Sequence, residues 1–198
     1  MFAMAPVLGI DPGLSRCGYG AVVRETGSRL RAVSCGVLRT DPALNLPQRL
    51  SILHDELESL IVELKPSVVV VERLLFQNNV RTAISVGQAS GLALAIAARH
   101  HIDVVQYSPN EVKLAIAGDG GAGKAEVGAM VARLLKLREV PKPADAADAL
   151  ALALCHLWRQ RVGAATESTR TLDVRSDREV GLPSGLDQRI AAALARRT

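Results

Sequence analysis

An acidic residue stands at the end of the first apolar stretch of the chain, where the backbone must turn. The stretch runs from Val7 to Asp11 and is broken at once by Pro12-Gly13. Proline fixes φ and glycine permits positive φ, so this pair predicts a tight turn that holds Asp11 at the mouth of a buried strand. Taken alone, the motif is also explained by a carboxylate that merely caps the turn. Acids at comparable places elsewhere would indicate chemistry instead.

A second acid ends another apolar stretch. Residues 67–71 form a continuous run dominated by valine, which predicts a strand buried on both faces, and Glu72 closes it. If this strand is the parallel neighbour of Val7–Asp11, the two carboxylates lie close together. Ligands of open α/β sheets bind at the carboxyl ends of the strands, which is where both acids fall.

Two further acids open the last helix of the apolar part of the chain. Asp145 and Asp148 are three residues apart and therefore share a helix face. Acids near a helix N-terminus are also explained by their interaction with the macrodipole. The helix continues, however, as the almost wholly apolar stretch 149–158, and a helix buried on most sides would carry both acids inward towards the sheet.

Four carboxylates gathered in one place repel one another and raise each other's pKa unless cations neutralise them. Carboxylate-rich oxygen ligation suits Mg²⁺ or Mn²⁺. Two such ions about 4 Å apart are the arrangement for in-line phosphoryl displacement, in which one activates water and the other stabilises the leaving oxygen. The four histidines have no spacing typical of a zinc site. The chemistry predicted from these residues is in-line phosphoryl displacement with two metal ions per site.

The elements that position these acids can be predicted from turn residues and hydrophobic spacing. Three strands come first, at 7–11, 18–24 and 29–38, and the short turns between them require antiparallel pairing. A helix over residues 47–65 has aliphatic residues at the 3–4 spacing of one buried face. The remaining predicted elements are the strand at 67–71, a small-residue helix at 81–100, a strand at 102–107, a short helix at 109–117, a glycine-rich loop at 118–123, a helix at 124–137, and a final helix from Pro143 to about residue 160.

This order predicts an α/β fold in which antiparallel strands precede parallel strands linked by crossover helices. The result is a mixed five-stranded sheet with helices on both faces. We expect one folded domain to span residues 1–162 and a poorly ordered basic extension to span 163–198, with a possible short amphipathic helix at 186–197. The segment from Arg159 to the C-terminus carries a net charge of +3 out of +4 for the chain, so the overall basicity mostly reflects the extension.

Composition excludes several classes of protein. No apolar run reaches the roughly 18 to 20 residues that a membrane span requires, so we expect no membrane association. The N-terminus lacks the pattern of a secretory signal. The three cysteines, Cys17, Cys35 and Cys155, are far apart in the sequence and odd in number, which fits reduced thiols in a cytoplasmic protein.

The ordered set of motifs resembles a known family, the RuvC-type crossover junction endodeoxyribonucleases, which have a ribonuclease H-like fold. The resemblance runs from about residue 7 to 158 and omits only the C-terminal extension. Any single segment is weakly specific, but their order is highly specific. The matching segments are Gly9-Ile10-Asp11-Pro12-Gly13 with Gly18-Tyr19-Gly20, Val71-Glu72 with Asn79, Gly87-Gln88-Ala89-Ser90-Gly91, Val112-Lys113, Lys124, and Asp145-Ala146-Ala147-Asp148-Ala149.

The resemblance implies a function and a set of catalytic residues. Asp11, Glu72, Asp145 and Asp148 match the family's metal-binding catalytic acids. The family acts as a homodimer on four-way (Holliday) DNA junctions during recombination and repair. It makes two symmetric nicks and works beside the branch-migration proteins RuvA and RuvB. We therefore expect this chain to be a junction-resolving endonuclease.

Residues that contact DNA are also implied, with one departure from the family pattern. The family often places an aromatic residue three positions after the catalytic glutamate, where it stacks on junction bases. Here that position is Leu75 and Phe76 follows. We expect Phe76 to stack and Leu75 to support it as a wedge, although both could instead belong to the core. The other DNA-binding candidates are Asn79, Arg81, Gln88, Lys113 and Lys124.

Two other functions remain open from the sequence. An actin-like or sugar-kinase-type phosphotransferase also begins with a strand, a buried aspartate and a glycine-bearing hairpin, and Gly118-Asp119-Gly120-Gly121 could imitate its second phosphate loop. The chain is too short for the two lobes of such enzymes, and the Asp145–Asp148 pair would be unexplained. A non-catalytic junction-binding protein is the second alternative, and the presence of all four acids argues against it.

Overall fold

The computed structural model describes residues 5–25, 29–73 and 80–167. The chain divides into two compact units, Met1–Ala165 and Thr166–Thr198, and the fold and pocket described below lie in the first. The strands are β1 (Val7–Asp11), β2 (Arg16–Arg24), β3 (Leu30–Arg39), β4 (Val68–Glu72) and β5 (Asp103–Tyr107). The helices are α1 (Leu46–Leu64), α2 (Val80–Arg99), α3 (Pro109–Ala117), α4 (Lys124–Leu134) and α5 (Ala144–Glu167).

The strands form the predicted mixed sheet, with the order β3-β2-β1-β4-β5. β1 pairs antiparallel with β2, and β2 pairs antiparallel with β3. β1 pairs parallel with β4, and β4 pairs parallel with β5. The central position of β1 follows from its composition, because a fully apolar strand is stable only where both faces are covered. The predicted neighbourhood of the first and fourth strands is confirmed.

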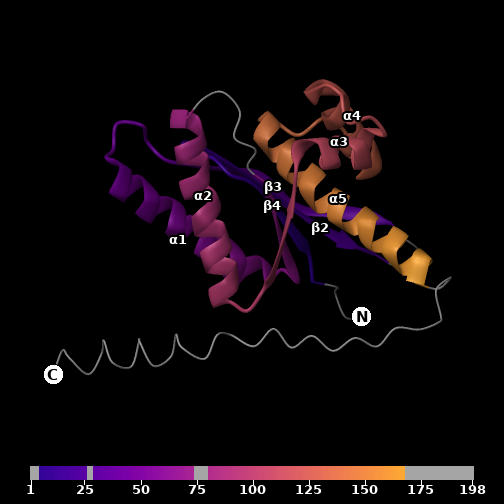
Figure 1. Ribbon diagram of the computed structural model, residues 1–198, viewed down its shortest axis with the longest axis horizontal. Coiled ribbons are helices and arrows are strands. Elements are labelled where there is room, and N and C mark those ends of the chain that lie inside the picture. Colours follow the sequence, from indigo (N-terminus) through magenta and orange to yellow (C-terminus); the bar gives the residue numbers. More distant parts are fainter. Residues whose placement is uncertain (1–4, 26–28, 74–79, 168–198) are drawn as a thin grey trace. The chain divides into compact units, whose positions relative to one another are not determined.

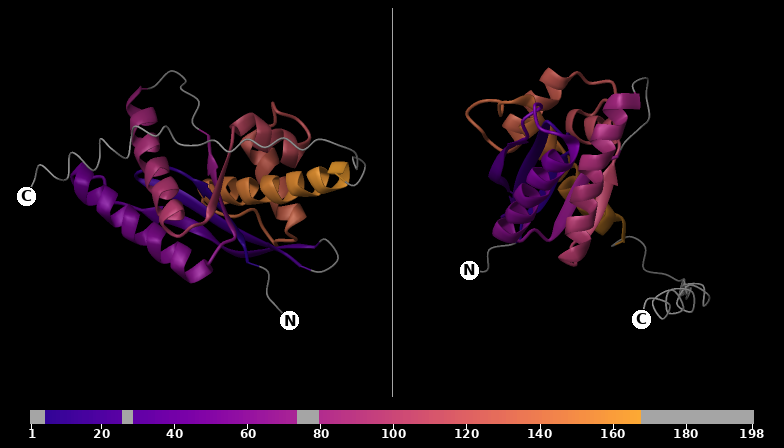
Figure 2. Two further views of the ribbon diagram at one scale, coloured as in Figure 1. Left: turned by 60° about the horizontal axis from the view of Figure 1, so that its bottom comes forward. Right: turned by 90° about the vertical axis from the view of Figure 1, so that its left-hand side faces the viewer.

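Helices cover both faces of the sheet, as predicted (Figure 1). α1 and α2 pack on one face, where Leu8, Ile10 and Val69 meet Leu53 and Ala93 in one core cluster. The helices α3, α4 and α5 lie on the other face, and the two further views in Figure 2 show the same separation. The second core cluster joins Val7, Val22 and Val70 of the sheet to side chains of these three helices. Alternate side chains of β1 and β4 therefore belong to two separate core clusters, one on each face of the sheet.

α5 lies unusually close to the sheet because glycines face it. A Cβ atom at Gly9 would collide with the backbone carbonyl oxygen of Ala149, and one at Gly18 would collide with that of Asp145. With hydrogen in place of a side chain at both positions, the backbone of α5 packs directly against β1 and β2. This contact fixes the first two turns of α5 over the carboxyl end of β1.

Most element ends lie within two residues of the sequence prediction, and the C-terminal ends of α4 and α5 differ by more. α1 and α3 begin with capping boxes set by Asn45 and Ser108, each followed closely by a proline. α4 ends at Leu134 rather than at residue 137, because Lys136 adopts a left-handed backbone conformation with φ of 54°. α5 begins at Ala144, so Pro143 precedes the helix instead of being its first residue. α5 also continues to Glu167, beyond the predicted end at about residue 160.

The predicted division at residue 162 and the predicted helix at 186–197 stay predictions, because residues 168–198 lie outside the described residues. Among the residues that the structure describes, no helix combines the length and the apolar character that crossing a membrane requires. The three cysteines are free thiols, as predicted, with Cys17 and Cys155 buried.

The packing of α5 on glycine predicts the effect of adding one methyl group. We expect Gly9→Ala to destabilise the fold by about 1–3 kcal/mol, because the helix must move away from β1. Gly91→Ala is the matched control: its Cβ would meet no atom within 4 Å, and alanine is the better helix former. Urea denaturation of both variants measures the difference. Equal stability of the two variants would contradict the close contact.

Candidate active site

Asp11 and Glu72 lie side by side at the carboxyl ends of β1 and β4. The parallel register pairs Ile10 with Val71, so the next residue on each strand is one of the two acids. Asp11 follows Gly9 by two positions and therefore points to the α5 face of the sheet, and Glu72 follows Val70 in the same way. Both side chains line a single pocket. The structure thus brings the first two predicted acids together.

The first turn of α5 brings Asp145 and Asp148 to the same edge. The backbone of Asp145 packs over Gly18, and Gly18 is the cross-strand partner of Asp11. Asp148, one turn further along, lines the pocket together with Asp11 and Glu72. The side chains of Asp145 and Asp148 are about one-quarter exposed. All four predicted acids are therefore gathered at one end of the sheet, on three separate elements.

The acids influence one another electrostatically. Burial, together with the charges of Glu72, Asp148 and Asp145, raises the pKa of Asp11 from 3.8 to about 7, and Lys124 opposes this shift. The pKa of Glu72 is also raised, first by burial and then by Asp148. Like charges in a poorly hydrated site disfavour the ionised form. Near neutral pH, Asp11 is therefore close to half protonated.

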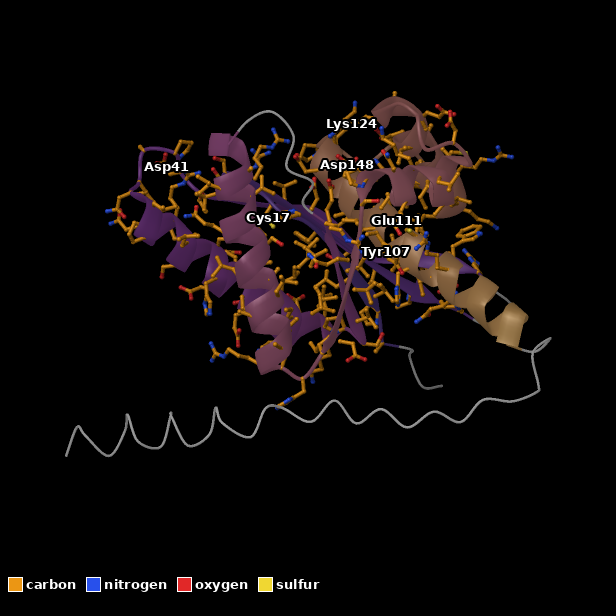
Figure 3. All side chains as sticks on the ribbon, viewed as in Figure 1. Cys17, Asp41, Tyr107, Glu111, Lys124 and Asp148 are labelled. Atoms are coloured by element: carbon orange, nitrogen blue, oxygen red, sulfur yellow. The ribbon has the colours of Figure 1, made fainter. Side chains whose placement is uncertain are left out.

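Two basic side chains neutralise part of this negative charge. The Lys124 ammonium Nζ donates to Asp148 Oδ2 at 3.0 Å, and this interaction raises the lysine pKa. Figure 3 shows Lys124 and Asp148 together near the start of α5. On the other side, the Arg16 guanidinium donates through Nε to Asp145 Oδ2 at 3.1 Å, with a second ion-pair contact through Nη2. Arg16 was not predicted; the available signal was a basic residue opening the strand after the Asp11 turn.

The chemistry of the donor set fits divalent metal ions. Every candidate ligand is a carboxylate, which suits Mg²⁺ or Mn²⁺, and after burial the neighbouring carboxylates Glu72, Asp148 and Asp145 raise the pKa of Asp11 further. Across the described residues, no three acidic, histidine or cysteine side chains are arranged to hold an ion at once. The ion pairs explain this arrangement, because Arg16 and Lys124 occupy Asp145 and Asp148.

The pocket beside the acids is also lined by basic and apolar side chains. Its volume is about 350 Å³. Lys113 of α3 and Lys124 of α4 line it together with three acids, while Val112 and Leu152 supply apolar surface. Lysine ammonium groups can donate to phosphate oxygens. Both predicted lysines line the pocket that holds three of the acids.

The other predicted DNA-binding residues are distributed differently. Leu75, Phe76 and Asn79 lie outside the described residues, and of Arg81 only the helical backbone in α2 is described. Gln88 is half-buried on α2 and does not line the pocket. The roles of these five residues stay predictions.

Arg73, the last described residue before positions 74–79, is hydrogen-bonded to β5. The sequence did not predict this contact. The Arg73 amide donates to the Tyr107 carbonyl oxygen at 2.7 Å, and its guanidinium Nη2 donates to the Gln106 carbonyl oxygen at 3.0 Å. Glu111, at the start of α3, lies 3.9 Å from the Arg73 guanidinium. The chain therefore leaves Glu72 from a fixed point on β5.

This sheet order and this set of acids define a protein of the ribonuclease H-like nuclease class, and comparisons with known proteins narrow the class. The family model "Crossover junction endodeoxyribonuclease RuvC" matches residues 7–156. The chain therefore belongs to the RuvC family. A Salinispora arenicola protein of that name is 51% identical over 168 residues, covering 83% of this chain and 96% of the relative. A Cutibacterium acnes protein of the same name is 48% identical over 168 residues, covering 83% and 86%.

Solved structures agree with the family assignment. Thermus thermophilus RuvC is 36% identical with a TM-score of 0.74, and the alignment covers 80% of this chain and 96% of that one. The structure titled "T. thermophilus RuvC in complex with Holliday junction substrate" gives a TM-score of 0.76 at the same identity, covering 81% and 97%. The predicted ribonuclease H-like fold and the predicted family are both confirmed.

The raised pKa of Asp11 predicts how metal-free protein responds to pH. The folded state holds the Asp11 proton up to about pH 7, whereas the unfolded chain releases it near pH 3.8. The folded state binds more protons between these values, so its stability falls as pH rises from about 4 to 7. Asn does not titrate, so we expect Asp11→Asn to lack this pH-dependent loss of folding stability, which is on the order of 3 kcal/mol. Urea denaturation in EDTA from pH 5 to 8 measures this, and equal pH slopes for both proteins would contradict it.

Proposed function

We propose that this chain is an endonuclease that resolves four-way DNA junctions by metal-dependent nicking during recombination and repair. The observation that carries the proposal is the gathering of Asp11, Glu72, Asp145 and Asp148 at one end of the sheet, beside a pocket with two lysines. The chain belongs to a family of crossover junction endodeoxyribonucleases. A solved structure shows a relative, Thermus thermophilus RuvC, in complex with a Holliday junction substrate.

In the mechanism we propose, the four acids hold two divalent cations, Mg²⁺ or Mn²⁺. Such a pair of ions supplies an activated water and stabilises the leaving oxygen. Asp11 and Glu72 are set on rigid strand ends, so their positions are fixed before substrate arrives. To hold the cations, Asp145 and Asp148 would have to release Arg16 and Lys124, with which they are paired. Lys124, once released from Asp148, and Lys113 then hold the phosphate in the pocket.

We also propose that the segment after Arg73 separates the bases at the crossover. Arg73 is fixed to β5 at the edge that carries the acids, so the chain that follows starts beside the reacting phosphate. Phe76 offers a π-face for stacking, and Leu75 offers an aliphatic wedge. Asn79, Arg81 and Gln88 follow in sequence and extend the proposed DNA-binding surface along the start of α2.

A homodimer is the assembly that we propose, acting beside RuvA and RuvB. Two symmetric nicks require two sites related by a two-fold axis. The helix at 81–100 is the expected seam, through its small residues Ala83, Gly87, Ser90 and Gly91. Ser90 is buried within its own chain, so it cannot form part of an exposed seam. The exposed face of α2 carries Ile84, which is 56% exposed, and Gly91.

The phosphotransferase alternative is not supported by the geometry. The glycine-rich loop at 118–121 joins α3 to α4, and Gly118 is the left-handed C-cap of α3. None of these four residues lines the pocket that holds the acids. The loop is explained by helix termination, and a phosphate-binding role has no structural support. The non-catalytic alternative leaves the shared placement of four acids unexplained.

The proposed function predicts metal-dependent nicking of a synthetic mobile four-way junction, with little cutting of linear duplex. Asp11→Asn and Glu72→Gln remove metal-binding carboxylates, so each is expected to lower the cleavage rate at least 100-fold while junction affinity stays within a few-fold. Denaturing gels measure cleavage and fluorescence anisotropy measures binding. Undiminished cleavage in excess EDTA, or full activity of either variant, would refute the proposal.

The proposed wedge predicts that Phe76 matters more than Leu75. Stacking on an aromatic ring is worth roughly 1–3 kcal/mol per base, and an aliphatic side chain offers no π-face. Phe76→Ala should therefore reduce junction cleavage more than Leu75→Ala, with 2-aminopurine fluorescence at the crossover reporting the loss of unstacking. If both signals are unchanged in Phe76→Ala, and the variant melts like the parent protein, stacking by Phe76 is ruled out.

A further inference from the structure

Two arginines lie at the edge of the sheet next to the acids, on the side away from Lys113 and Lys124. Arg16 opens β2 and Arg39 closes β3, and the two are cross-strand partners in the antiparallel register. Cross-strand partners point to the same face and lie about 5 Å apart. Arg16 also contacts Asp145. Arg16 therefore lies directly beside the acids.

Arg49 of α1 lies at the same strand ends but on the opposite face of the sheet, because Ser15 and Thr40, which it contacts, alternate with Arg16 and Arg39. Arg49 Nε donates to Thr40 Oγ1 at 3.0 Å, and its Nη2 donates to Ser15 Oγ at 2.5 Å. Ser15 precedes Arg16, and Thr40 follows Arg39. Thr40 is itself buried and donates to the Leu14 carbonyl oxygen at 2.6 Å. Arg49 is thus held in position by neutral hydroxyl groups, which leave its positive charge uncompensated.

The charge balance of the β2–β3 hairpin differs between its two ends. At the far end, Arg29 and Arg31 both form ion pairs with Glu25. At the end beside the acids, neither Arg39 nor Arg49 has a carboxylate within ion-pair distance among the residues that the structure describes. The nearby Asp41 carboxylate instead accepts from the Ala43 amide. Within the described residues, arginines without an acidic partner therefore lie at the end where DNA would be cut.

We infer that Arg16 and Arg39 form a second phosphate-binding site, which holds the DNA backbone on the β3 side of the acids. This inference rests on the proposed function. Guanidinium groups match phosphate oxygens in a bidentate fork. Since β1 lies between β2 and β4 in the sheet, the acids are flanked by arginines on one side and by Lys113 and Lys124 on the other. A strand bound across the acids is then held at both ends.

The test compares Arg39→Ala with Arg31→Ala, which removes the same charge from the other end of the same strand. Affinity for a labelled four-way junction and for a linear duplex is measured by anisotropy in EDTA, at several salt concentrations. Each lost phosphate contact reduces the salt slope by about 1. We expect Arg39→Ala to bind both DNAs roughly 3- to 10-fold more weakly, with a slope reduced by about 1, and Arg39→Lys to retain most of the affinity. Arg31→Ala should bind as the parent does.

Replacing single phosphates near the cut site by neutral methylphosphonates locates the contact. We expect a position where this replacement weakens binding of the parent protein but not of Arg39→Ala, because the contact is already absent. If Arg39→Ala binds as Arg31→Ala does, with the same salt slope, the inference is overturned while the proposed function stands. If the parent protein binds no DNA at all, both fall. Thermal melting of each variant separates a binding defect from unfolding.

Discussion

The packing of α5 against glycine is the contact on which the rest of the structure depends. Gly9 and Gly18 have no side chain, so the backbone of α5 lies directly on β1 and β2. A larger residue at either position would hold the helix off the sheet, and Asp145 and Asp148 would move with it. The same contact buries the apolar stretch that follows Asp148 in the second core cluster. Core packing and the spacing of the acids are therefore set by one interface.

The four acids lie close enough to repel one another, and two basic side chains of the same protein partly neutralise them. Burial and mutual repulsion raise the pKa of Asp11 to about 7. Lys124 and Arg16 each bind one of the α5 acids, which lowers the repulsion without placing a cation directly on Asp11. Both basic residues are substantially exposed, with side-chain exposures of 79% and 45%. Exposed partners are released more readily than buried ones, because water can replace the lost interaction.

Sequence reasoning predicted the sheet and the acids because both are encoded in local patterns. Each strand-end acid follows an apolar run. The register of β1 and β4 places Asp11 and Glu72 at the same edge of the sheet, as predicted from those runs. The ion pair of Arg16 with Asp145 was not predictable in this way, since its members are 129 residues apart and only the docking of α5 joins them. The end of α4 was missed because the left-handed conformation of Lys136 has no signal such as glycine. The inward position of Ser90 depends on which face of α2 meets the sheet, and a helix of small residues leaves that choice open.

The position of α5 in the chain has a consequence for protein synthesis. Asp11 belongs to the first strand to leave the ribosome, whereas Asp145 and Asp148 belong to the last helix of the compact unit. A nascent chain can pair β1 with β2 and β3 long before α5 exists, but it lacks two of its four acids until that helix docks. Chains truncated before residue 145 cannot assemble the site at all. A nuclease built in this order stays inactive against cellular DNA until its domain is complete.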